Sequence, residues 1–225
     1  MPVKILLEII KKESKSGISI CEIGCWDGET TITYMPIIKE LKGSATVIDW
    51  FKGNIDIDSH HCHGYHPNKR ESTKKRFIDN IGETYLPYIS IIEGNSQDKQ
   101  ILNKIPEKTF DIVFIDASHK YQDVKNDIIN YLPKVKDNGI ICGHDCETLR
   151  LVNSFTREEL EQDYVLKNHL GFKQKVHAGV IQAVYDVFGI DVEILDDLPG
   201  GSDAPIWVKR VKRNQNDHFK QTRPY

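Results

Sequence analysis

The sequence predicts an α/β protein built on a doubly wound, mostly parallel sheet of seven strands that finishes in an antiparallel C-terminal hairpin. Short apolar, β-branched runs alternate along the chain with segments of helical period, as in a parallel sheet covered by helices on both faces. The chain has 225 residues, of which 39% are hydrophobic and 28% are charged. This length and this composition suit one globular domain with embellishments.

Five apolar runs are expected to form the parallel strands, because they are short and rich in Ile, Val and Phe. They are residues 18–23, 45–50, 88–92, 110–115 and 139–142. Two further β-like pieces, 192–194 and 206–211, flank the sequence Leu-Pro-Gly-Gly at 198–201. A proline and glycines between two such pieces predict the final hairpin.

The helices are predicted from apolar residues spaced at three and four. They are expected at 1–12, 29–41, 121–132 and 179–188, with a shorter one around 158–164. In the third of these, Tyr121, Val124 and Ile128 share one face, and Pro133 ends the pattern.

We expect one domain over residues 1–210, followed by a basic tail at 211–225. Segments 52–72 and 146–175 do not fit the alternation and follow strand ends, where long insertions commonly form lids or substrate pockets.

The histidine run from His60 to His66 lies in the first insertion. A metal site is one interpretation of this run, but a mobile, substrate-facing loop is preferred.

The overall charge bears on the partners of the protein. A formal net charge of -3 gives no reason to expect nucleic acid or an anionic membrane as a partner, and a homo-oligomer remains open. No apolar stretch is long enough to cross a bilayer. The five cysteines, an odd number, suit reduced thiols, so a cytoplasmic location is expected.

The most informative segment is 18–31, where a buried strand leads into a glycine-bearing turn and then a helix. Helix N-termini of this kind favour negative or polar ligand groups. A dinucleotide site would need G-x-G-x-x-G, but Trp26 and Glu29 occupy the second and third glycine positions. With Glu22 before the turn and glycines at Gly24 and Gly28, the segment instead resembles motif I of class I S-adenosylmethionine-dependent methyltransferases. A structural turn without a ligand is the alternative.

Polar residues at the next two strand ends support a nucleoside site. Asp49, followed by Trp50, ends the second strand, where a carboxylate can accept hydrogen bonds from both ribose hydroxyls. Asn95 and Ser96 follow the third strand, where the methyltransferases that the sequence resembles usually hold the adenine. Together with Glu22, Gly24, Trp26, Gly28 and Asp116, these residues form the predicted cofactor site.

The fourth and fifth strands each end in a carboxylate with a histidine nearby. Asp116 and His119 follow the fourth strand, and His144 and Asp145 follow the fifth. Neighbouring parallel strands would bring Asp116, His144 and Asp145 together at the ligand-binding edge of the sheet. Two carboxylates and an imidazole could hold Mg²⁺, Mn²⁺ or another divalent ion, although the histidine is less typical of magnesium.

As an ordered set, these motifs resemble the small metal-dependent O-methyltransferases related to the catechol and macrocin O-methyltransferases, a group that includes cephalosporin hydroxylase-like proteins. The resemblance covers roughly residues 18–210 and includes the segment 177–184 that leads into the last predicted helix. It implies a Rossmann-like methyltransferase fold and metal ligation by Asp116, His144 and Asp145. His144 departs from the acidic pair of that group.

The resemblance implies methyl transfer from S-adenosylmethionine to a hydroxyl of a sugar, glycan or other small molecule. Asp116 is the first candidate for the catalytic base, with His119 and His144 as alternatives. Two other functions stay open. One is an NAD(P)-dependent oxidoreductase, which the glycine spacing and the lack of a Tyr-x-x-x-Lys pair disfavour. The other is a nucleoside-binding module without catalysis.

Overall fold

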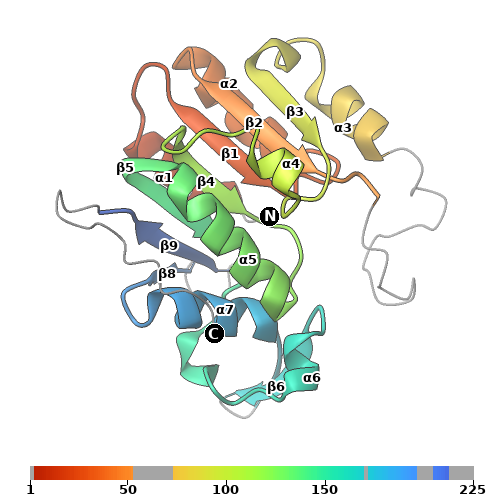
Figure 1. The fold of residues 1–225 in the computed structure, drawn as a ribbon, viewed down its shortest axis with the longest axis vertical. Coiled ribbons are helices and arrows are strands. Elements are labelled where there is room, and N and C mark those ends of the chain that lie inside the picture. The colour runs from red at the N-terminus through yellow and green to blue at the C-terminus, as the bar shows by residue number, and fades with distance from the viewer. Residues whose placement is uncertain (1–2, 53–72, 170–171, 197–204, 213–225) are drawn as a thin grey trace.

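Seven strands form one sheet in the order β3-β2-β1-β4-β5-β9-β8 (Figure 1). The computed structural model describes residues 3–52, 73–169, 172–196 and 205–212. The strands are β1 (Ser19–Ile23), β2 (Ser44–Asp49), β3 (Ile89–Glu93), β4 (Phe110–Ile115), β5 (Val135–Gly143), β8 (Glu193–Leu195) and β9 (Ile206–Arg210). The first five pair in parallel, whereas β9 runs antiparallel to both β5 and β8. The predicted fold class and C-terminal hairpin are therefore confirmed.

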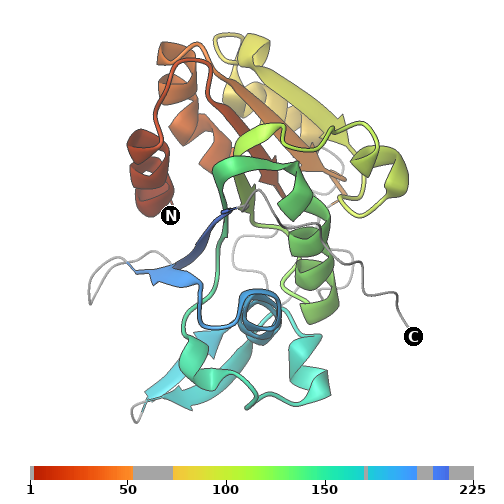
Figure 2. The ribbon, with the colours of Figure 1, turned by 60° about the vertical axis from the view of Figure 1, so that its left-hand side comes forward.

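Helices cover both faces of the sheet (Figures 1 and 2). One face carries α1 (Val3–Lys12), α2 (Glu29–Glu40) and α3 (Thr73–Ile81), and the other carries α4 (Lys99–Leu102), α5 (Tyr121–Tyr131) and α7 (Ala178–Phe188). Strand side chains alternate between these layers. On β1, Ile20 packs with α1 and α2, whereas Cys21 and Ile23 pack with α5 and α7.

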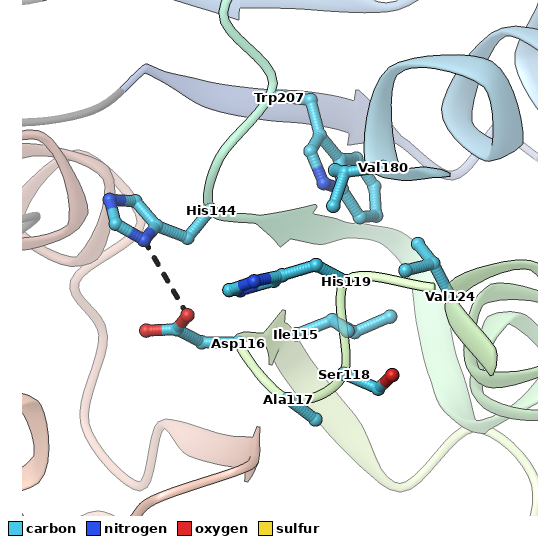
Figure 3. Close-up of a pocket in the computed structure, with 9 residues that line it drawn as sticks. All are labelled: Ile115, Asp116, Ala117, Ser118, His119, Val124, His144, Val180 and Trp207. Atoms are coloured by element: carbon cyan, nitrogen blue, oxygen red, sulfur yellow. Dashed lines mark ion pairs between the residues drawn. The ribbon is translucent and has the colours of Figure 1, made fainter. Parts of the chain in front are cut away.

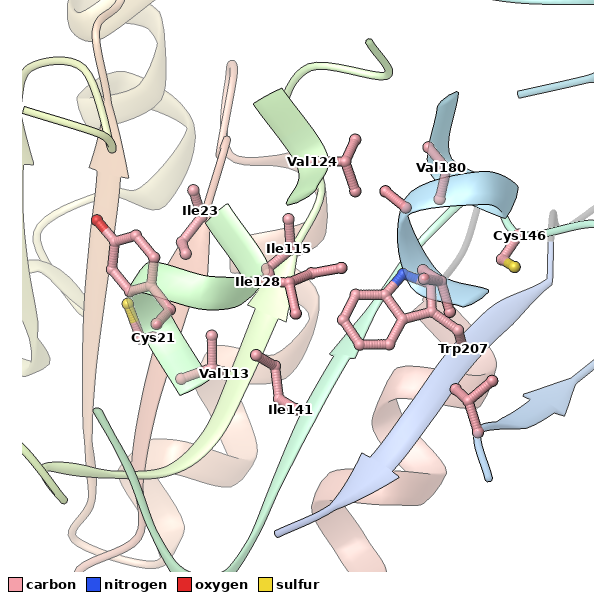
Figure 4. Close-up of a cluster of buried hydrophobic side chains, with 14 of the residues drawn as sticks. Cys21, Ile23, Val113, Ile115, Val124, Ile128, Ile141, Cys146, Val180 and Trp207 are labelled. Atoms are coloured by element: carbon pink, nitrogen blue, oxygen red, sulfur yellow. The ribbon is translucent and has the colours of Figure 1, made fainter. Parts of the chain in front are cut away.

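The larger apolar cluster places α7 beside the sheet, next to the edge where β4 and β5 end (Figure 4). Trp207 on β9 is fully buried there, and its ring lies 5.8 Å from that of Phe188 on α7. Val180 at the start of α7 and Val124 on α5 join the same cluster. This packing brings the N-terminus of α7 to the carboxyl ends of β4 and β5.

The region 146–175, predicted as an insertion, contains a 3-10 turn (Leu149–Leu151), α6 (Arg157–Leu160) and a separate hairpin of β6 (Val165–His169) and β7 (Phe172–Val176). The expected helix at 158–164 is shorter, beginning at a capping box between Thr156 and Glu159 and ending at Leu160. The hairpin and α3 were not predicted, because their segments are mostly polar and lack a continuous apolar run.

Several expectations fall on residues that the structure does not describe. These are the histidine-rich part of the first insertion, at 53–72, and the tail from 213 onward. Within the described ranges, no helix is both long and apolar enough to cross a membrane. Cys21, Cys25, Cys142 and Cys146 are buried free thiols.

Candidate active site

The glycine turn after β1 lies at the carboxyl edge of the sheet, with Gly24 and Gly28 in the left-handed region at φ of 81° and 82°. A Cβ atom at Gly24 would lie 2.2 Å from the carbonyl oxygen of Asp116, and one at Gly28 would lie 2.9 Å from the Phe77 ring. Glycines in such a turn can leave room for a ligand to approach the backbone. At both positions, however, that room is filled by the protein itself, so packing and backbone conformation already require glycine.

Asp49 at the end of β2 holds this turn in place. Its Oδ2 accepts hydrogen bonds from the backbone N–H groups of Cys25 and Trp26, both at 2.9 Å, and its Oδ1 accepts one from Phe51 at 2.7 Å. A carboxylate has about four acceptor positions, so this one can still accept from a ligand hydroxyl. The Trp26 and Trp50 side chains, at the ends of β1 and β2, are 44% and 38% exposed.

Two predicted cofactor residues have internal partners. The buried Glu22 carboxylate accepts hydrogen bonds from the hydroxyls of Thr31 and Tyr34, both at 2.6 Å, and so ties β1 to α2. The Ser96 hydroxyl donates to Asp127 on α5 at 2.7 Å. Both side chains therefore shape the cofactor edge from within the fold. Asn95, in contrast, uses its side-chain oxygen only to cap the backbone N–H of Gln97 among the contacts described.

Asp116, His144 and Asp145 meet at the ends of β4 and β5, as the sequence predicts. His144 Nδ1 lies 3.5 Å from Asp116 Oδ1 (Figure 3). The same nitrogen lies 3.0 Å from Asp145 Oδ2, and one ligand atom of each of the three residues lies within 4.8 Å of the others. Burial lowers the pKa of His144, but the two carboxylates outweigh it and raise that pKa to about 10. His144 Nε2 is buried and has no hydrogen-bond partner within the described chain.

His119 is held between two carboxylates. Its Nδ1 lies 2.7 Å from Asp163 Oδ1 and its Nε2 lies 3.1 Å from Asp145 Oδ2. Burial lowers the pKa of His119, but the hydrogen bonds to Asp145 and Asp163 prevail and raise it to about 10. Both ring nitrogens are engaged, so His119 is less available than Asp116 to take a proton from a substrate.

Three residues of this site were not predicted. His177 Nδ1, just before α7, lies 2.5 Å from Glu147 Oε1 and 3.4 Å from Asp145 Oδ1, and Asp163 approaches from the segment after α6. The only sequence signal was the place of His177 in the segment 177–184, which resembles known methyltransferases, and no role was assigned to it. His177 lies near Asp145 because of the way α7 packs against the sheet, and no local sequence pattern predicts that packing.

A small pocket opens between the polar and apolar parts of this edge (Figure 3). Asp116, Ser118, His119 and His144 form its polar side. The other lining residues are Ile115, Ala117, Val124, Val180 and Trp207. The lining of this small pocket therefore combines polar and apolar side chains.

The sequence matches the family described as "Methyltransferase domain" over residues 21–146, more than half of the chain. No curated protein matches it.

Solved structures share the fold at low sequence identity. A putative O-methyltransferase from Klebsiella pneumoniae has a TM-score of 0.58 and 16% identity, with 93% of this chain and 79% of that chain covered. The O-methyltransferase TomG from Streptomyces achromogenes, in complex with SAM, has a TM-score of 0.57 and 15% identity over the same shares. An rRNA methylase from Streptococcus thermophilus has a TM-score of 0.55 and 7% identity, with 94% and 98% covered. At these identities the likeness concerns the fold alone.

Proposed function

This chain belongs to the methyltransferase domain family, and on that premise we propose that it methylates a hydroxyl group of a small molecule, such as a sugar, glycan, polyol or phenol. Family and fold together make it a class I S-adenosylmethionine-dependent methyltransferase. The observation that carries the hydroxyl assignment is the group of Asp116, His144 and Asp145 at the edge of a part-apolar pocket.

The proposed cofactor site follows the ends of β1, β2 and β3. Asp49 would accept a hydrogen bond from a ribose hydroxyl at the acceptor position that the turn leaves open. The exposed rings of Trp26 and Trp50 would contact the nucleoside, and Asn95 would face the adenine. Gly24 and Gly28 set the turn, while Glu22 and Ser96 would act indirectly.

The carboxylates of this edge also fit the charge of the cofactor. Burial is the main cause of the raised pKa of Glu22, and the negative charges of Asp116 and Asp49 raise it further. Both carboxylates therefore act on the same end of β1. S-adenosylmethionine has a positive sulfonium and an ammonium group. A negative edge next to the glycine turn would favour both.

For the transfer itself, the chain must hold the acceptor hydroxyl in line with the methyl group and remove its proton. When bound, S-adenosylmethionine would supply the methyl group and leave as S-adenosylhomocysteine, and a base of the chain would take the hydroxyl proton. Asp116 is the preferred base, and His144 is the alternative. The buried Nε2 atom of His144 has no hydrogen-bond partner among the described residues, and a substrate hydroxyl could supply one.

Asp116, His144 and Asp145 fit a divalent cation, because they offer two carboxylates and one imidazole within 4.8 Å. When bound, such an ion would lower the pKa of the hydroxyl and help to position it.

The proposal is tested by calorimetry with S-adenosylmethionine, S-adenosylhomocysteine and NAD, followed by radiolabelled methyl transfer to a panel of sugars, phenols and structured RNA. We expect both S-adenosyl compounds to bind, NAD not to bind, and label to appear on a hydroxyl of a small molecule. Label found only in RNA would overturn the small-molecule assignment. Binding without transfer to any acceptor in the panel would favour a nucleoside-binding module, and NAD binding would favour an oxidoreductase.

A further inference from the structure

A second group of metal-binding side chains shares Asp145 with the site described above. His119, Asp145 and His177 each offer one ligand atom, and these atoms lie within 4.8 Å of one another. His119 Nε2 lies 3.1 Å from Asp145 Oδ2, and His177 Nδ1 lies 3.4 Å from Asp145 Oδ1. The three residues come from the loop after β4, the end of β5 and the residue before α7. Three separate elements therefore converge on one point.

Two outer carboxylates orient these imidazoles. Asp163 contacts His119 Nδ1 at 2.7 Å, which directs His119 Nε2 toward Asp145. Glu147 contacts His177 Nδ1 at 2.5 Å through one oxygen and accepts the His177 backbone N–H through the other at 3.1 Å. At His119, the Asp163 carboxylate contacts the ring nitrogen that does not face Asp145, as in metal sites where such a carboxylate fixes the ring and raises its basicity. At His177, the Glu147 carboxylate contacts the same nitrogen that faces Asp145 and so fixes the position of that ring.

The packing around Gly179 holds the two histidines together. A Cβ atom at Gly179 would lie 2.2 Å from the carbonyl oxygen of His119 and 2.5 Å from the backbone nitrogen of Tyr121. Only a glycine lets the first turn of α7 approach the loop after β4 this closely. The His119 and His177 rings consequently lie 4.5 Å apart, edge to face. The His177, Glu147 and Asp145 side chains are at most 9% exposed, so the group is enclosed as well as close.

We propose that His119, Asp145 and His177 form a second divalent metal site, one that takes a borderline transition-metal ion such as Zn²⁺, Co²⁺ or Fe²⁺ rather than Mg²⁺. Two imidazoles and one carboxylate are the donors that these ions prefer, whereas Mg²⁺ prefers oxygen. Asp145 is the only residue common to this site and to the group with Asp116 and His144. The ion would join the ends of β4 and β5 to the start of α7. The proposal does not depend on methyl transfer, because metal binding is measured without cofactor or acceptor.

The first experiment uses the unmutated full chain. The protein is stripped of metal and loaded with one equivalent of Zn²⁺ or Co²⁺, and X-ray absorption spectroscopy counts the imidazole ligands. We expect two imidazoles, whereas an ion held by Asp116, His144 and Asp145 would have one. A single imidazole, or no binding of either ion at micromolar concentration, would overturn the proposal.

Variants of the two groups then act as matched controls for each other. His119→Gln and His177→Gln should each weaken Co²⁺ binding at least tenfold and change its visible absorption spectrum. Asp116→Asn and His144→Gln should leave the Co²⁺ affinity and the absorption spectrum nearly unchanged. Asp163→Asn should weaken Co²⁺ binding 10- to 100-fold, as expected for a residue that orients a metal ligand. Circular dichroism and thermal melts show which variants are folded. If His177→Gln does not fold, His119→Gln and Asp163→Asn give the same test. The reverse pattern, with loss in Asp116→Asn and none in His119→Gln, would refute the second site.

Discussion

Gly24 on the turn after β1 lies directly against the backbone of Asp116 at the end of β4, with 2.2 Å between a Cβ built at Gly24 and the Asp116 carbonyl oxygen. The same approach lets the Gly24 N–H donate to the Ile48 carbonyl and the Asp116 N–H donate to the Ile23 carbonyl, at 2.9 and 2.8 Å. The proposed cofactor turn and the backbone of the proposed catalytic residue Asp116 are thus packed against each other. A substitution that moves one of them should also move the other.

Gly24→Ala should therefore destabilise the fold by about 2–4 kcal/mol, because it adds a backbone clash to a left-handed conformation. Gly82→Ala is the matched control, since Gly82 has a similar φ of 69° but open space around it. We expect that variant to cost only about 1 kcal/mol. Urea unfolding measures both, and equal losses would show that contact with Asp116 does not matter.

Asp49→Ala should weaken S-adenosylmethionine binding by about 1–3 kcal/mol, because a ribose hydroxyl would lose its carboxylate acceptor. It should also lower the melting temperature, because the backbone N–H groups of Cys25, Trp26 and Phe51 lose their partner. Calorimetry at a temperature where the variant is folded separates the two effects. Unchanged affinity in the folded variant would remove Asp49 from the cofactor site.

Asp116→Asn should lower methyl transfer about 100-fold or more, the usual contribution of a general base or its equivalent. Asp145→Asn and exhaustive chelation should also lower the rate if a divalent ion assists. Asp137→Asn, a surface carboxylate paired with Lys108 at 2.9 Å, is the control. Full activity after chelation would count against metal assistance and leave Asp116 to contact the substrate directly.

Asp111, at the opposite end of β4, should contribute acid-sensitive stability. Burial alone would raise its pKa, but hydrogen bonds from Lys15, Lys136 and Ser19 outweigh burial and lower the pKa to about 2. Because the folded pKa lies below the unfolded value, the contribution is present above pH 4 and is lost as the pH falls from about 4 to about 2. We expect about 1–2 kcal/mol, less than the full shift because Lys15 is largely exposed. The unfolding free energies of the wild type and of Asp111→Asn, measured by denaturation, should converge between pH 4 and pH 2. A difference that stays constant with pH would contradict the lowered pKa of Asp111.

Glu22 should have the opposite pH dependence. Burial raises the pKa of Glu22 to about 7, with a smaller contribution from the nearby charges of Asp116 and Asp49. The hydrogen bonds from Thr31 and Tyr34 lower this pKa, but by less than burial raises it. The protonated form is therefore favoured by folding, so stability is greatest below about pH 4.5 and falls until about pH 7. Glu22→Gln removes the ionisation, so relative to wild type this variant should gain about 1–3 kcal/mol between pH 5 and pH 8. Parallel stability curves would mean that Glu22 titrates normally.

Local periodicity accounts for most of the predicted fold. The boundaries of β4 match the predicted residues 110–115, and those of α5 and α7 differ from the predictions by one residue. These elements have a continuous apolar run or an apolar stripe, both of which are visible within a dozen residues. The β6–β7 hairpin has no such signal, because most of its residues are polar and their pairing depends on the partner strand.

The sequence by itself determined that Asp116, His144 and Asp145 would meet. Each follows a strand of a parallel sheet, and the carboxyl ends of neighbouring parallel strands lie at one edge. Only the tertiary structure decided that His177, Glu147 and Asp163 join them. Their places follow from the contact of α7 with the loop after β4 at Gly179 and from the path of the chain after α6. Such contacts join residues tens of positions apart and depend on how whole helices and strands pack, so no local sequence pattern predicts them.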